Sequence, residues 1–173
     1  MSFDTKKAIK SLLVNDPGPI DPMTEAPDPT KALPALLAKD PADPTQPAIL
    51  NSRMTDLLSN AKPVYDCVTF RESVGGRLKS DVRTPVEYGQ SRDEEWHERF
   101  DFEVWSQQPD GGQSRDAIKQ RITALLMEQS FTTTGGALVY CQLAGDVIDD
   151  YDKSLNAYYS TMGFQLQVLY PAA

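Results

Sequence analysis

The stretch Phe100-Asp101-Phe102-Glu103-Val104-Trp105 places an apolar side chain at every second position from Phe100 to Val104. Because successive side chains of a strand point to opposite faces, this period of two predicts a strand with one buried face. Trp105 directly follows Val104, so it leaves the alternation and is predicted to point to the opposite face. There it either packs under a second layer or belongs to a surface between subunits, where tryptophan is enriched.

The period changes after this strand. Pro109, Gly111 and Gly112 interrupt the chain, and Ser114 is the predicted N-cap of a helix from Arg115 to Gln129. The apolar stripe of this helix consists of Ile118, Ile122, Leu125 and Leu126. A short apolar run at 138–141 and an alternating segment at 164–170 predict two later strands. The sequence therefore predicts a compact unit of sheet and helix.

Further elements are predicted before Phe100. Residues 64–71 are typical of a first strand, and Val86 to Tyr88 of a short second strand that pairs antiparallel with 99–105. The charged stretch 92–98 is predicted to be a polar turn. Pro47 suits the first position of a helix. The apolar face of that helix would consist of Ile49, Leu50, Met54, Leu57 and Leu58.

Proline divides the chain into two parts, because nine of the thirteen prolines precede Asn51. We expect an N-terminal helix and Asp-Pro-rich arm at 1–46, and a globular domain at 47–173. The arm begins with a helix at 5–14, whose apolar side consists of Phe3, Ile9, Leu12 and Leu13. The recurring Asp-Pro dipeptides favour an extended, polyproline II-like conformation. The arm is either a disordered tail or a strap that anchors its helix on a neighbouring subunit.

The composition disfavours several classes of function. A net charge of −8 repels nucleic acid and anionic membranes, because phosphate binding depends on clustered Lys and Arg. Cys67 and Cys141 are too few for a disulfide scaffold and are expected to be buried thiols. The sequence shows no signal peptide and no apolar stretch long enough to span a membrane. We therefore expect synthesis and folding in the cytoplasm.

The sequence offers little that resembles reactive chemistry. His97 is the single histidine, and three nearby carboxylates give weak support for a metal or general-base site. The acidic cluster around Asp146, Asp149 and Asp150 lacks the alternating oxygens and the glycine of a calcium loop. No nucleotide cradle or nucleophile elbow occurs. We expect no catalytic, cofactor or metal site.

The order of these segments resembles that of the tail terminator (tail-completion) proteins of tailed bacteriophages. The short strand after a proline at 84–88 resembles the family pattern, as does the strand at 100–106, which ends in tryptophan and serine. The helix at 114–127 and the acidic turn at 149–152 before the last strand are also similar. The resemblance covers about 49–170 and rests on order and hydrophobic pattern. The long Asp-Pro arm departs from it.

The resemblance implies an α/β (α+β) fold, with a small, mainly antiparallel sheet and helices packed on it. It also implies a virion protein that forms a ring, usually of six copies, at the head-proximal end of the tail tube. The ring stops tube polymerisation and joins the tail to the head connector or stopper protein, while DNA passes without specific binding. Candidate subunit contacts are Phe3, Ile9, Leu12, Leu13, Val86, Tyr88 and Trp105. Candidate acidic residues of the lumen or a ring face are Glu94, Glu95, Asp146, Asp149 and Asp150.

Other interpretations stay open at this point. A different neck or connector ring protein would fit the same pattern. A cytoplasmic adaptor whose acidic loop binds a basic partner would form a binary complex that salt weakens, and no ring. A small metal-dependent enzyme centred on His97 would lose its activity when His97 is changed.

Overall fold

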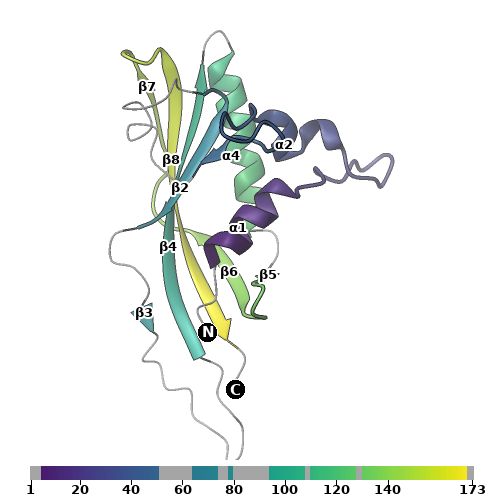
Figure 1. Ribbon diagram of the computed structural model, residues 1–173, viewed down its shortest axis with the longest axis vertical. Coiled ribbons are helices and arrows are strands. Elements are labelled where there is room, and N and C mark those ends of the chain that lie inside the picture. The colour runs from purple at the N-terminus through teal and green to yellow at the C-terminus, as the bar shows by residue number, and fades with distance from the viewer. Residues whose placement is uncertain are drawn as a thin grey trace, which may run out of the picture.

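The chain folds as an α+β domain with a curled, mostly antiparallel sheet and helices packed against it, as predicted (Figure 1). This computed structural model describes residues 5–50, 64–73, 78–79, 94–107, 110–127 and 130–170. Its helices are α1 (Thr5–Val14), the 3-10 turn η1 (Pro29–Lys31), α2 (Leu33–Leu36) and α4 (Gly111–Met127). Its strands are β1 (Ile49–Leu50), β2 (Cys67–Glu72), β3 (Leu78–Lys79), β4 (Glu94–Gln107), β5 (Phe131–Thr132), β6 (Leu138–Leu143), β7 (Ile148–Asp152) and β8 (Ala157–Tyr170).

Two long strands form the centre of the sheet. β4 and β8 are 14 residues each and pair antiparallel along their whole length, from Glu94 opposite Tyr170 to Gln107 opposite Ala157. The strand order is β1-β2-β4-β8-β6-β5, and β3 and β7 add to β4 and β8. β2 lies on the other edge of β4 from Phe100 to Trp105. Both edges of that stretch are therefore occupied, and its predicted pairing with 86–88 is wrong.

One face of the sheet carries the core. Phe102 stacks on Phe70 with ring centroids 5.3 Å apart and meets the edge of Phe164 at the same distance. Helix α4 lies across this face (Figure 1) and buries all four residues of its predicted stripe. The helix begins at Gly111, so Ser114 lies inside it and is not its cap. Gly111 allows the close approach to β4, because a Cβ there would lie 2.8 Å from the Ser106 carbonyl oxygen.

Three further local predictions are wrong, each because pairing within the sheet overrides local preference. The expected polar turn at 92–98 is the beginning of β4, where Trp96 lies opposite Val168. The acidic turn at 149–152 belongs to β7, which pairs with the first residues of β8. The helix expected from Pro47 is contradicted at Ile49 and Leu50, which form β1 and pair parallel with β2. Its remaining residues lie outside the described ranges.

The Asp-Pro dipeptides form turns and do not build an extended arm. In each of the five, the aspartate carboxylate accepts the backbone N–H of the residue after the proline. Aspartate supplies this local acceptor while proline fixes φ, which is the chemistry of an Asx turn. The five donors are Gly18, Met23, Thr30, Ala42 and Thr45. The segment therefore folds back on the domain, and the predicted polyproline II extension is wrong.

Helix α1 has the predicted bounds but a different partner. Ile9 and Leu13 are fully buried in the same core cluster as Phe70 and Ile118. The Lys6 ammonium lies 5.5 Å from the centroid of the Phe70 ring, over β2. The apolar side of α1 therefore packs on its own chain through Ile9 and Leu13. Phe3 lies outside the described residues.

Candidate functional site

Of the remaining predicted contact residues, the structure describes Leu12 and Trp105. Leu12 is half-buried at the edge of the core. Val86 and Tyr88 lie outside the described residues. Trp105 points away from the main core, as predicted, and is 5% exposed. Its ring stacks on Tyr159 at 4.7 Å, and its indole N–H donates to Glu103 at 3.3 Å. Of the two options for Trp105, the structure supports packing within the chain.

The predicted acidic residues divide into two groups at opposite ends of the β4–β8 pair. Glu95 lies opposite Leu169, whereas Asp149 lies opposite Ser160, nine residues away along β8. At the rise of a strand this separation is roughly 30 Å. Glu94 begins β4, and Asp146 is exposed in the loop before β7. No single acidic cluster forms among these described residues.

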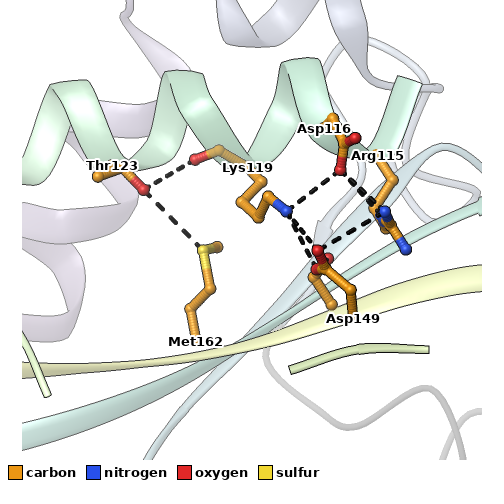
Figure 2. A network of polar contacts seen from close by, with 7 residues as sticks. Arg115, Asp116, Lys119, Thr123, Asp149 and Met162 are labelled. Atoms are coloured by element: carbon orange, nitrogen blue, oxygen red, sulfur yellow. Dashed lines mark hydrogen bonds and ion pairs between the residues drawn. The ribbon is translucent and has the colours of Figure 1, made fainter. Parts of the chain in front are cut away.

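Asp149 belongs to a network of charged and polar side chains under α4 (Figure 2). The Lys119 ammonium donates to both oxygens of Asp149, at 3.0 and 2.8 Å, and lies 3.1 Å from Asp116. The Arg115 guanidinium lies 3.0 Å from Asp116 and 3.7 Å from Asp149. The Ser160 hydroxyl donates to Asp149 at 2.5 Å. The network joins α4 to β7 and β8.

The pKa values of the network reflect this pairing. Burial alone would raise the pKa of Asp149, but hydrogen bonds from Lys119 and Ser160 and the nearby positive charges outweigh it and lower the pKa. The pKa of Asp116 is lowered in the same way. Burial would lower the pKa of Lys119, but hydrogen bonds to Asp149 and Asp116 raise it. Each group is therefore held in its charged form.

The network has a testable pH dependence. A lowered carboxylate pKa contributes stability above the unfolded value, near 4, and loses it as the pH falls through the folded pKa. The raised pKa of Lys119 contributes stability that is lost as the pH rises above about 10. We expect Asp149→Asn to lower the free energy of unfolding at pH 7, and this loss to disappear as the pH falls through the lowered pKa of Asp149. Urea denaturation of both proteins across pH measures this. A difference that grows in acid would contradict the assignment.

A second polar group joins the N-terminal segment to α4. The Asp16 side chain is fully buried and binds the Arg121 guanidinium through both oxygens, at 2.5 and 2.8 Å. It also accepts the backbone N–H groups of Leu33 at 2.7 Å and Gly18 at 2.9 Å. Burial would raise the pKa of Asp16, but these bonds, that of Arg121 foremost, lower it. Asp16 therefore connects three segments, although in the sequence it stands out only as one of the recurring Asp-Pro pairs.

Two hollows open on the helical side. One, of about 520 Å³, lies between α1 and the segment 131–134, with Leu12, Leu125 and Phe131 in its wall and Lys7 at its edge. The other, of about 560 Å³, lies between α4 and the N-terminal segment, lined by Ile20, Leu36 and Ala124. Neither presents a pair of reactive side chains, so both are candidates for packing surfaces.

The described residues contain no group of three or more His, Cys, Asp or Glu side chains that could hold a metal ion. His97 lies within β4, and its Nε2 is 3.1 Å from Glu95. Burial raises the pKa of the Cys141 thiol to about 12, and the pKa of Cys67 is also raised. Within the described part of the chain, no helix has the length and apolar character needed to cross a membrane.

Comparisons with known proteins identify no family for this chain. No protein-family model matches the chain, and no curated protein matches it. The chain is thus an α+β domain in which helices cover one face of the sheet. In the two polar networks described above, the acidic side chains are paired with Lys or Arg.

Proposed function

We propose that the protein is a structural component of a tailed bacteriophage virion. It forms a ring that caps the head-proximal end of the tail tube. In the tail terminator family, which the sequence resembles, this ring usually has six copies. Its partners are the tail tube protein and the head–tail connector or stopper protein, and DNA passes through the ring without specific binding. Capping follows from shape: one face matches the end of the tube, and the other offers nothing that the tube protein can extend.

The observation that carries this proposal is the agreement between the expected and observed fold. The resemblance implies a mainly antiparallel sheet with helices packed on it, and the chain has that architecture with the strand at 100–106 at its centre. The strand order also places the helix at 111–127 against that strand and the last strand beside it. The order of central strand, helix and last strand therefore agrees with the resembled family, although 149–152 is part of a strand and not a turn.

The sheet face that the helices do not cover has the character expected of a surface that lines a DNA channel. Exposed side chains along β4, β8 and β6 include Arg99, Gln165, Gln167, Tyr140 and Gln142. These residues are polar, neutral or singly charged, and the chain as a whole carries −8. A surface of this kind holds a phosphate backbone weakly, because it lacks clustered cations. It suits a conduit along which DNA slides.

The charge network changes one detail of the proposal. Asp149 is neutralised by Lys119 and Arg115, so it does not serve as a bare carboxylate in a lumen. Its engagement also weakens the alternative of an adaptor that presents this acidic segment to a basic partner. Asp146 and Asp150 are exposed and keep the candidate role.

A tube-growth assay tests the function. The tail tube protein encoded in the same genome is allowed to polymerise with and without this chain, and tube lengths are measured by electron microscopy. We expect shorter tubes that stop growing when the chain is present. Lengths that do not depend on the chain, at any ratio of the two proteins, would contradict capping.

A further inference from the structure

The loop at 18–28, between α1 and η1, projects from the helical side of the domain (Figure 1). Met23, at the end of the loop, is 90% exposed, whereas Ile20 lies at the base opposite Pro27 and lines the hollow beside α4. Met23 is therefore the large apolar side chain that the loop end presents to a partner. Because Met23 is almost fully exposed, the loop end does not occupy a groove of its own chain.

This loop is held in one conformation by its own hydrogen bonds. The Asp21 N–H donates to the Ala26 carbonyl at 2.9 Å, and the Glu25 N–H to the Asp21 carbonyl at 2.8 Å. At its base the Asp28 N–H donates to the Pro19 carbonyl at 2.8 Å, close to Gly18, where a Cβ would lie 1.9 Å from the Asp28 carbonyl oxygen. A loop ordered in this way loses little conformational entropy when it docks.

This loop and helix α1 carry opposite charges. The segment 16–29 contains four acidic residues and no Lys or Arg, whereas 5–14 contains three lysines and no acid. Asp16 and Asp28 are bound within the chain by Arg121 and Lys31. Asp21 and Glu25 lie on either side of Met23. The loop end is therefore apolar in the middle and acidic at its sides.

The hollow beside α1 has the complementary character. Leu12, Leu125 and Phe131 supply apolar surface, and Lys7 lines the hollow as well. The lining also contains Asp16, whose carboxylate is paired with Arg121. Its volume of about 520 Å³ exceeds that of a methionine side chain several-fold. Each copy of the chain thus carries both an acidic, apolar projection and a basic, apolar hollow.

We propose that the Met23 loop of one copy docks into the Lys7–Leu12–Phe131 hollow of the next copy. The contact is head-to-tail, so each copy both donates and accepts a loop, and such contacts close into a ring when the rotation allows it. This inference deepens the proposed function and rests on it, since it names the surfaces that would join neighbouring subunits. The occupant is a second copy because the two complementary surfaces belong to the same chain.

Disulfide crosslinking tests the contact. Met23→Cys and Ser11→Cys are introduced together, since Ser11 is exposed and lines the hollow. After mild oxidation of the protein, alone and on tail tubes, we expect a ladder of linked copies on a non-reducing gel. Neither single variant should give a ladder, because a head-to-tail link needs both cysteines. The native thiols, Cys67 buried and Cys141 half-buried, remain protonated and compete little.

A charge variant gives a second readout. We expect Met23→Asp to raise the concentration needed for half-maximal assembly at least about tenfold, the loss expected when one buried apolar side chain is removed from an interface. Ile148→Asp is the matched control, since Ile148 is 59% exposed but lies on β7. Thermal unfolding checks that both variants fold.

The outcomes separate this inference from the function. Rings that form without crosslinks, and that Met23→Asp leaves intact, would overturn the docking contact but not the ring. Crosslinks of Met23→Cys to the tube protein alone would overturn the assignment to a second copy. Capping that fails while copies still crosslink would contradict the function and keep the contact. The absence of both crosslinks and rings would overturn both.

Discussion

Replacing Asp16 with alanine is expected to lower the free energy of unfolding by about 3–5 kcal/mol, the usual cost of removing one partner of a buried ion pair. The fully buried Asp16 carboxylate is the shared acceptor for Arg121 of α4 and for the backbone N–H groups of Gly18 and Leu33. Its loss leaves these donors without that acceptor in a site closed to water. Urea denaturation monitored by tryptophan fluorescence measures the change.

Asp21→Ala is the matched control, because Asp21 begins the same kind of Asp-Pro turn but accepts only the Met23 N–H at an exposed position. We expect its effect to stay within about 0.5 kcal/mol, as for most surface substitutions. Equal effects of the two changes would show that Asp16 contributes as a turn residue and that its bond to Arg121 adds nothing.

The second large effect is expected for Phe102→Ala, which should lower the free energy of unfolding by about 3–5 kcal/mol. Phe102 is fully buried at the centre of β4 and contacts the rings of Phe70 and Phe164. The substitution removes apolar contacts with β2 and β8 and leaves a cavity under α4. Chemical denaturation of the purified variant gives the value.

Tyr140→Ala serves as its control, since Tyr140 is 44% exposed on β6 and lies opposite Gln167 on the open face of the sheet. We expect a change of less than about 1 kcal/mol there. A loss at Phe102 no larger than at Tyr140 would mean that the helix-covered face is not the core of the domain.

The sequence predicted the elements whose own period was strong. Alternation at 100–105 identified the central strand, and the stripe through Ile118 and Ile122 identified the helix that covers it. The helix predicted from Pro47 rested on an apolar face that began with Ile49 and Leu50, yet these two residues form a strand. Their state is decided by parallel pairing with Val68 and Thr69, which are far away in the chain.

Dependence on residues elsewhere in the chain also limited the prediction of the two polar networks. Each Asp-Pro pair contains its own turn acceptor, so the turns could have been foreseen from local chemistry. The partner of Asp16 could not, because Arg121 is 105 residues away. Arg115 and Lys119 are spaced one helical turn apart, which places both on one side of α4, but the sequence alone does not show that Asp149 lies opposite them.

We propose that copies of this chain close into a ring at one end of a tail tube. Electron microscopy of tubes grown with the purified chain tests it most directly, with the chain located by an antibody or by averaging of tube ends. We predict one closed ring of this chain at the same end of every tube, with the Met23 loop of each copy against its neighbour. Bare tube ends, or single unlinked copies along the tube, would contradict the account.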